Sequence, residues 1–444
     1  MKSSCSVIDD SREPMKSLRI LVLAPGCNPD STSTALVGYA HSEALARLHT
    51  VTLVGIEKHG ENLRRKRDRF HAVETVHSPW MTSISDWIIR WIFKGDYGSQ
   101  ALTALGYPFQ VLFEWKAWRL FRSRIMSGEF DVVLRLLPVV PTLPSPFAFF
   151  LRRGPIPFVI GPINGGLPWP AGFSQADKQK EWVSGLRNLY RHMPFARSTF
   201  RYAKAIIAGS SQTCSEFQRY QDKLFFVPEN GISQALLGKA TPKRGHTEPL
   251  ELIYLGRLIP YKACDLAVRA AAPLLRQGRA RMTIVGYGSE RGNLENLVNV
   301  LGVESAVEFC GRVAHTEAMD RLHKADVLIF PSVREFGGGV VFEALALGVV
   351  PIVADFGGPG DIVNSKVGYK ITLTNEQDVV AQMEKILMGL AEEGNCLVQL
   401  QNQAMQYAHD QLSWDGKAQL VSKILLWSVG RGSKPSLSPP KALC

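Results

Sequence analysis

The sequence lacks the features that define several common protein classes. Its seven cysteines are scattered and none forms a C-x-x-C pair, which argues against a disulfide framework or a zinc site. The segment before Leu18 is polar and has no apolar core, so it does not resemble a signal peptide. The longest apolar candidate, Leu136 to Leu151, contains four prolines and is unsuited to a membrane-spanning helix. We therefore expect a cytoplasmic protein.

Composition and charge indicate the number of domains and the kind of binding partner. A length of 444 residues suggests two domains, and the 45% apolar and 20% charged fractions are ordinary for a globular protein. The net charge of +11 favours a polyanionic partner, such as nucleic acid, anionic lipid or a phosphorylated substrate. The alternative is that the excess positive charge serves only solubility. The placement of the cations along the chain bears on this choice.

Short apolar runs alternate with longer amphipathic stretches, which is typical of parallel α/β proteins. In the first half the expected strands are Leu18–Leu23, Val51–Gly55, Asp131–Leu136, Phe158–Gly161 and Ala205–Ala208. In the second half they are Glu251–Leu255, Met282–Val285, Ala306–Phe309, Val327–Phe330 and Val350–Val353. Expected helices include Ala35–Arg47, Asp265–Leu275, Arg291–Leu301, Thr316–Lys324, Val340–Ala346 and Trp414–Trp427.

This alternation predicts two Rossmann-like, doubly wound domains that face a central cleft, where a ligand would bind at the carboxyl ends of the strands. The polar stretch Ser233–Pro249 is interpreted as a linker. The expected division is a disordered N-terminus over 1–17, a first domain over 18–228, a second over 229–411, a helix over 412–429 and a disordered tail over 430–444.

Two cations follow the first strand of the second half. Arg257 and Lys262 are five positions apart, and the strand end should face the ligand. Because Arg offers a planar fork and Lys a point charge to phosphate oxygens, this pair suits a diphosphate. The alternative is two unrelated surface cations.

The strongest motif runs from Phe330 to Ala344, where a buried strand leads into a glycine-rich loop and a helix. The backbone N–H groups and the dipole at the helix start near Val340 predict an anion site. Glu335 and Glu343 flank this loop and would accept hydrogen bonds from sugar hydroxyls, although Glu343 alternatively complements the helix dipole. Together the groups describe a nucleotide-sugar site. Gly286, in a Gly-Tyr-Gly turn, is a weaker signal for close backbone approach.

The second half resembles the donor domain of retaining glycosyltransferases of family 4 (glycosyl transferases group 1), which have the GT-B fold. The matching segments are LGRLIPYKACDLAVRA, IVGYGSERGNLENLVNVLG, FCGRV, FPSVREFGGGVVFEALALG and ADFGGPGDIV. Glu335 and Glu343 have the spacing of that family's paired glutamates, and SWDGKAQLVSKILLW resembles its final helix, which crosses back to the first domain. Ser233 stands where the family often has Asp, and Asp361 where it often has Glu.

The resemblance implies a role for each matched residue. Arg257 and Lys262 would bind the donor diphosphate and, together with Glu335 at the transferred sugar, would act in catalysis. The ribose hydroxyls would be held by Glu343. The remaining donor-side residues are Gly286 and Arg312 at the nucleobase, and Gly337, Gly338, Gly339 and Val340, whose backbone approaches the donor. Asn230 matches a loop on the hinge side of the cleft.

The first half resembles the family far less. Many relatives carry several glycines after the first strand, where this chain has only Gly26. Relatives also often carry a His after the strand that ends here near Arg135, and no His is found at this place. Asn164, Gly165 and Gly166 follow another strand and should face the cleft, where they would contact the acceptor or the sugar. The alternative for these three is a structural turn.

Aromatic and basic residues are mixed over Trp80–Arg124, which contains five tryptophans and is preceded by a basic run from Arg64 to Arg69. Such a mixture on amphipathic helices suits the interface of an anionic membrane, to which each cation adds about 1 kcal/mol. The alternative is that the tryptophans are core residues under a basic face. Nucleic acid is a poorer partner, since no nucleic-acid-binding signature accompanies the charge.

The sequence therefore predicts a glycosyltransferase that moves a sugar from a nucleotide-sugar donor to a saccharide or lipid-linked acceptor with retention of configuration. Its expected role is in cell-surface polysaccharide or glycolipid synthesis, at the inner face of the membrane. No cofactor and no metal are expected. The rival interpretations are a nucleotide-sugar epimerase or a soluble glycogen- or sucrose-type synthase on the same fold, and a non-catalytic scaffold protein.

Overall fold

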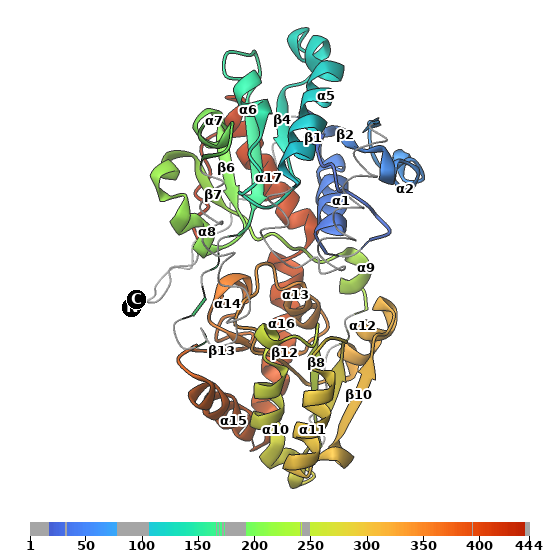
Figure 1. Ribbon diagram of the computed structural model, residues 1–444, viewed down its shortest axis with the longest axis vertical. Helices are drawn as coiled ribbons and strands as arrows, with labels where there is room; N and C mark the ends of the chain where they lie inside the picture. The colour runs from blue at the N-terminus through green and yellow to red at the C-terminus, as the bar shows by residue number, and fades with distance from the viewer. Residues whose placement is uncertain are drawn as a thin grey trace, which may run out of the picture.

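The computed structural model describes residues 17–31, 33–77, 106–165, 167, 169–170, 173, 192–239, 241, 249–392 and 394–439. Within these residues the chain forms two parallel sheets, one in each half of an elongated molecule, with helices on both faces of each sheet (Figure 1). The prediction of two Rossmann-like, doubly wound halves is thereby confirmed.

The first sheet has the strand order β3-β2-β1-β4-β5-β6-β7, and its paired strands are parallel. The strands are β1 (Arg19–Leu23), β2 (Thr50–Ile56), β3 (Ala72–Val76), β4 (Val132–Arg135), β5 (Phe158–Ile163), β6 (Ala205–Ala208) and β7 (Leu224–Phe226). The central strands are apolar runs buried on both faces, as parallel sheets covered by helices require.

The second sheet has the order β10-β9-β8-β11-β12-β13. Its strands are β8 (Leu250–Leu255), β9 (Ala280–Val285), β10 (Val307–Gly311), β11 (Val327–Phe330), β12 (Val350–Ala354) and β13 (Tyr369–Ile371). In both sheets the strand order reverses beside the first strand, so the carboxyl ends of β1 and β8 flank the places where such sheets bind ligands.

Helices cover both faces of each sheet. In the first half they are α1 (Ser33–Ala46), α2 (Gly60–Arg64), α5 (Tyr107–Met126), α6 (Pro146–Phe150), α7 (Ala196–Tyr202) and α8 (Ser211–Glu216). In the second half they are α9 (Gln234–Leu237), α10 (Cys264–Arg276), α11 (Arg291–Leu301), α12 (His315–Lys324), α13 (Gly339–Ala346), α14 (Gly357–Ile362), α15 (Glu376–Glu392) and α16 (Gly394–Gln411). Residues of α10 and α15 pack on one face of the second sheet, and residues of α13 and α16 on the other.

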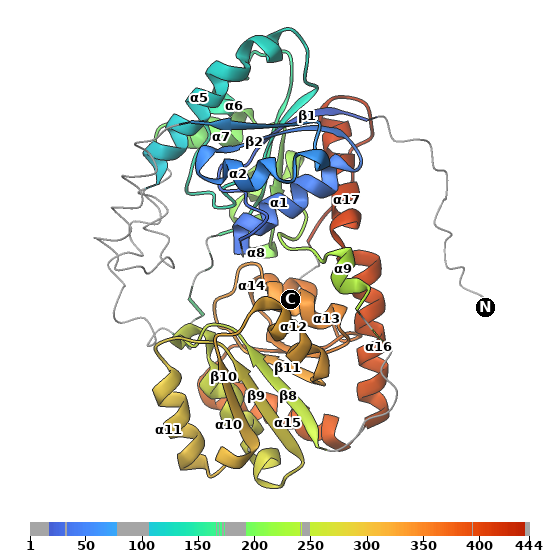
Figure 2. The ribbon, with the colours of Figure 1, turned by 90° about the vertical axis from the view of Figure 1, so that its right-hand side faces the viewer.

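The last helix, α17 (Trp414–Ser428), returns to the first half and packs beside α1, as Figure 2 shows. Ser413 caps it by accepting a hydrogen bond from the Gly416 N–H at 3.1 Å. Next to this cap the two connections between the halves pair: the Ile232 N–H donates to Leu412 O at 2.9 Å, and the Trp414 N–H donates to Ile232 O at 3.0 Å. The hinge therefore consists of two chain segments that lie side by side.

Every strand expected from the sequence is present, with ends within two residues of the expected ones. The short edge strands β3, β7 and β13 were not expected. Part of the stretch interpreted as a linker forms α9, which Ser233 caps. The tail expected to be disordered is described as far as residue 439, and its Leu437 O accepts a hydrogen bond from the Phe226 N–H of β7 at 2.9 Å. This bond satisfies an edge-strand donor, which explains the ordered path.

Candidate functional site

A largely buried ion pair lies where the adjacent parallel strands β8 and β11 end in the second half. Lys262 ends a turn after β8, and its Nζ contacts Glu335 Oε2 in the loop after β11. The second carboxylate oxygen, Glu335 Oε1, accepts a hydrogen bond from the Gly338 N–H at 3.3 Å. The two side chains are only 11% and 17% exposed. The structure therefore brings together a cation, a carboxylate and the backbone that precedes α13, as the sequence predicts.

The glycine-rich loop between β11 and α13 is packed tightly. Gly338 has a φ of +57°, and a Cβ at this position would lie 2.8 Å from Pro359 Cγ. A Cβ at Gly337 would lie 2.5 Å from Asn230 Nδ2 of the hinge. The loop thus needs glycine for both its backbone conformation and its packing. Helix α13 begins at Gly339, where the first N–H groups of a helix have no partner within the helix and favour an anion.

Glu343 lies in the second turn of α13 and is paired. Its Oε1 lies 3.0 Å from Nε2 of His315, the first residue of α12. The hydrogen bond to Glu343 raises the pKa of His315, more than burial lowers it. Sequence analysis missed His315, because a single His at a helix start carries no distinguishing pattern.

Arg257 and the Gly286 turn lie at neighbouring strand ends. The Arg257 guanidinium donates to Tyr261 Oη at 2.9 Å. Gly286, at φ +156°, passes so close to Gly256 that a Cβ would lie 1.8 Å from its carbonyl oxygen. Arg312 stacks over the Tyr287 ring at 5.1 Å. The residues predicted for the diphosphate and for the nucleobase therefore follow adjacent strands β8, β9 and β10.

A segment of the first half crosses to this site. The ring of Trp169 lies 6.3 Å from that of Tyr261, edge to face, and Arg334 Cζ lies 5.6 Å from the Trp169 ring. Phe173 is buried in the core cluster of the second half. Sequence analysis treated this segment only up to Gly166, although the apolar and aromatic residues that follow in GGLPWPAGF were a visible signal.

Of the residues predicted on the acceptor side, some contact the second half and others lie only at the same edge of the first sheet. Asn164 is buried and touches the second half, since its Nδ2 donates to Phe336 O at 3.0 Å. Asn230 lies against Gly337. Gly165 directly follows Asn164, and Gly26 lies in the turn after β1, on the same edge of the first sheet. Gly166 lies outside the described residues.

Arg135, the last residue of β4, is paired within the first half. Its guanidinium lies 3.5 Å from Glu114 of α5, and both side chains are almost fully buried. Burial raises the pKa of Glu114 and lowers that of Arg135, and each partner opposes the shift of the other. The pair ties α5 to the central strand β4.

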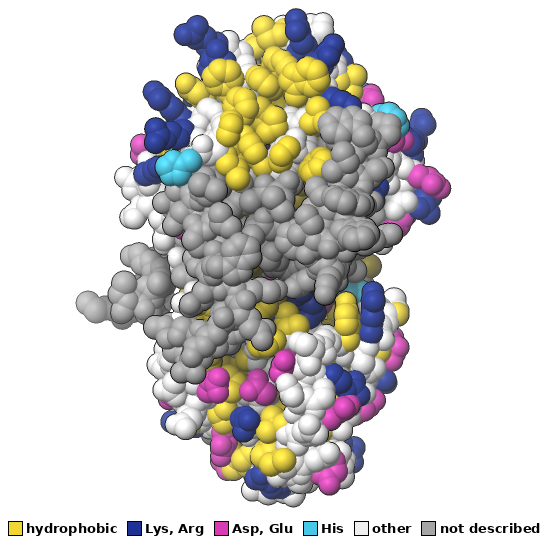
Figure 3. Space-filling view, in the orientation of Figure 1, with side chains coloured by type: hydrophobic (Ala, Val, Ile, Leu, Met, Phe, Trp, Pro, Cys, Tyr) yellow, Lys and Arg dark blue, Asp and Glu magenta, His cyan; other side chains and the backbone are white. Residues whose placement is uncertain are grey.

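The outer face of the first half combines apolar and basic side chains (Figure 3). On α5, Trp115 and Leu120 are about half exposed, and Arg119 lies over the Trp115 ring at 5.0 Å. Trp118 instead packs edge to face on Phe147 at 5.7 Å. One of the two described tryptophans of this helix is therefore exposed, and the other takes part in packing.

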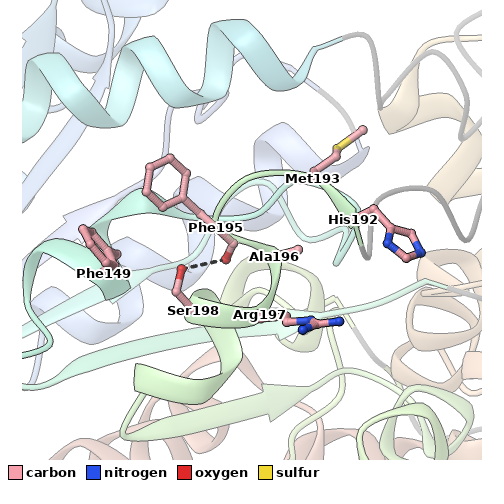
Figure 4. A pocket seen from close by; sticks show the side chains of 7 residues that line it. All are labelled: Phe149, His192, Met193, Phe195, Ala196, Arg197 and Ser198. Carbon is pink, nitrogen blue, oxygen red and sulfur yellow. Dashed lines mark hydrogen bonds between the residues drawn. The ribbon is translucent and has the colours of Figure 1, made fainter.

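Between α6 and α7 lies a pocket of about 480 Å³, drawn in Figure 4. Its lining residues are Phe149, His192, Met193, Phe195, Ala196, Arg197 and Ser198. Phe195 has a φ of +64° and accepts a hydrogen bond from Ser198 Oγ at 3.0 Å. The lining comes entirely from the first half, and includes none of the residues of the Lys262–Glu335 site.

The two halves and the strand-end site define a protein with the GT-B fold. UDP-bound HepE of Anabaena superposes with a TM-score of 0.59 at 16% identity, over 92% of this chain and 99% of that one. Residues 239–397, most of the second half, match the family model Glycosyl transferases group 1.

Curated relatives match in part. An uncharacterized glycosyltransferase of Methanocaldococcus jannaschii is 31% identical over 254 residues, which are 53% of this chain and 63% of the relative. A glycogen synthase of Mycobacterium tuberculosis is 30% identical over 226 residues, 48% of this chain and 52% of the relative. The chain thus spans between about half and two thirds of the length of these relatives.

Proposed function

We propose that this protein is a retaining glycosyltransferase of family 4 that moves a sugar from a nucleotide-sugar donor to a saccharide or lipid-linked acceptor. The observation that carries the proposal is the Lys262–Glu335 pair set against the glycine loop at the start of α13. HepE, which shares the fold, has been solved with UDP and with UDP-glucose, which supports a donor of this class.

In the proposed reaction Arg257, Lys262 and the start of α13 bind the donor diphosphate. These groups stabilise the negative charge that develops on the leaving nucleotide, which is the main way a fixed site lowers such a barrier. Glu335 positions the transferred sugar, and the leaving phosphate oxygen takes the proton of the acceptor hydroxyl on the same face. The charge is neutralised by the cations, so we expect activity without an added metal.

The other proposed donor-binding residues also lie near the strand ends. Glu343 holds the ribose hydroxyls, and Gly286 with Arg312 flanks the nucleobase. On the acceptor side we propose Gly26, Gly165, Gly166 and Asn230. We propose that the first domain spans 18–228, the second domain 229–411 and the returning helix 412–429.

The acceptor is proposed to lie at an anionic membrane, with the protein cytoplasmic and peripheral on its inner face. Trp115, Leu120 and Arg119 on the outer side of α5 support this, because exposed apolar and basic groups on one helix suit the membrane interface. Much of the stretch Trp80–Arg124 that first suggested membrane contact, its residues 80–105, lies outside the described residues. Among the helices described, none is long and apolar enough to cross a bilayer.

A ligand-binding experiment tests the donor assignment directly. The melting temperature of the protein is measured with UDP, GDP, ADP and dTDP and with their sugar conjugates. A ligand at 100 times its dissociation constant adds about 2.7 kcal/mol to the free energy of unfolding. We expect one nucleotide series to raise the melting temperature in the wild type and in the exposed control Lys385→Ala, but not in Lys262→Ala. Absence of any rise in the wild type would contradict the proposed function.

A further inference from the structure

Asn164 joins three parts of the molecule through one amide group. It follows β5, is 3% exposed, and its Nδ2 donates to Glu229 Oε2 at 2.9 Å and to Phe336 O at 3.0 Å. Its Oδ1 accepts from Ser210 Oγ at 2.9 Å and from Thr213 Oγ1 at 3.3 Å. The first half, the hinge and the glycine loop of the second half therefore meet at this side chain.

The orientation of this amide follows from the partners. Glu229 Oε2 and Phe336 O offer acceptors to Nδ2, whereas the two hydroxyl groups can donate to Oδ1. A flipped amide would place its oxygen against a carboxylate and a carbonyl, which is unfavourable in a buried site. Both ends of the Asn164 amide are thus engaged within the protein.

Glu229 belongs to the hinge and is also buried. Burial raises its pKa, and the negative charge of Glu335 acts in the same direction, while the bond from Asn164 opposes the shift. Its neighbour Asn230 packs against Gly337. The hinge therefore contacts the glycine loop next to the residue that Asn164 holds.

A second bond crosses between the halves nearby. The Ser211 N–H at the start of α8 donates to Asp361 Oδ2 of α14 at 2.7 Å. Gly358 of α14 approaches the loop so closely that a Cβ there would lie 2.1 Å from Phe336 O. The first half thus contacts the glycine loop directly through Asn164, and contacts α14, which packs against the loop, through Ser211.

We propose that Asn164 is a positioning residue that couples the approach of the two halves to the shape of the donor-binding loop. This inference rests on the proposed function and refines the acceptor-side role expected for Asn164, because its amide holds the loop rather than the acceptor. When the halves move apart, the bond to Phe336 breaks and the one to Glu229 remains. The glycine loop is then no longer held at Phe336, two residues before Gly338, whose N–H donates to Glu335.

Three variants isolate the bond to Phe336. Asn164→Asp places a carboxylate against both Glu229 and Phe336 O. Glu229→Gln keeps an acceptor for Asn164 and leaves the bond to Phe336 intact. The double variant, Asn164→Asp with Glu229→Gln, restores a bond between positions 164 and 229 but leaves the Phe336 carbonyl facing a carboxylate.

Gln401→Glu is the matched control, because this buried amide also donates to a carboxylate, Asp326 Oδ1 at 3.2 Å, within the second half. This variant shows how much activity and stability are lost when any buried carboxyl group is placed beside a second one. Melting temperature, kcat and KM for sugar transfer, and hydrogen exchange of the amides over 336–339 are measured for all variants.

We expect Asn164→Asp to lower kcat by about 100-fold, the size expected for a misplaced reacting group, with a much smaller change in donor KM. The double variant should remain as slow. Glu229→Gln should keep a kcat close to that of the wild type, although loss of the charge that acts on the buried Lys417 should lower its melting temperature. Only the variants with Asp at 164 should exchange faster over 336–339. A loss of kcat in Gln401→Glu equal to that in Asn164→Asp, or full recovery in the double variant, would overturn the proposal. If the wild type transfers no sugar, the proposed function fails, and the exchange measurement alone decides whether Asn164 holds the loop.

Discussion

The two halves share an architecture but differ in how their functional residues are distributed. In the second half Arg257, Lys262, Glu335 and Glu343 lie in short motifs at strand ends, and the chain from 239 to 397 matches one family model. In the first half, the contacts to this site come from single residues of one segment, such as Asn164 and Trp169, and that part of the chain lies outside the family match. The proposed site of the second half is therefore readable from local sequence, whereas the contacts from the first half become visible only in the folded structure.

We expect the largest loss of activity from a substitution in the second half. Lys262→Ala removes a cation from the proposed phosphate site and leaves Glu335 partly buried without it. Loss of one such fixed charge-stabilising group typically lowers kcat by about 10² to 10³-fold. Turnover is measured with the donor found in the melting experiment, and circular dichroism verifies folding. Near-wild-type turnover in a folded variant would remove Lys262 from the mechanism.

The next effect concerns the stability of the first half. Glu114→Ala leaves Arg135 buried and unpaired, which should lower the free energy of unfolding by about 3–5 kcal/mol. Glu129→Ala is the control, since it breaks the exposed pair with Arg124 and should cost about 1 kcal/mol or less. Urea denaturation measures both. Equal losses would show that the buried pair does not anchor α5.

A smaller effect should appear in membrane binding, which only the first half is proposed to provide. Reversal of Arg119 and Arg122 to Glu removes two cations worth about 1 kcal/mol each near an anionic surface. We expect sedimentation with vesicles containing phosphatidylserine to weaken by more than about tenfold, because 1.4 kcal/mol corresponds to a factor of ten. Arg276 and Arg281, both in the second half, give a charge-matched control when changed to Glu. Unchanged sedimentation of the α5 variant would argue against docking through this helix.

The smallest effect is the pH dependence of the His315–Glu343 pair. Because the folded pKa of His315 is raised above the ordinary 6.5, its stabilisation is present below that value and disappears as pH rises through the raised pKa. His315→Ala should therefore lower the free energy of unfolding more at acidic than at alkaline pH, by less than about 1 kcal/mol since the ring is largely exposed. Glu343→Gln should abolish this difference.

The two halves differ in how many of their structural features could be predicted from the sequence. The central strands were predictable, because apolar runs mark parallel strands, and Lys262 and Glu335 were recognisable in motifs at the strand ends. The ion pair between these two side chains was not predicted. The edge strands β7 and β13 were missed because they have only three residues each. Strand β3 was missed because four of its five residues are only partly buried, so it lacks the apolar run of a central strand. Long-range partners such as Asn164 with Phe336, 172 positions apart, leave no periodic trace in a single sequence.

The paired hinge has a consequence for synthesis of the chain on the ribosome. The core of the first half includes Trp414, Val421 and Leu425 of α17, so that half is completed only after the whole second half has been made. All six strands of the second sheet precede α17 in the chain. Domains generally fold as units during translation. The second half is therefore able to fold while the first half, begun earlier, still lacks its final helix.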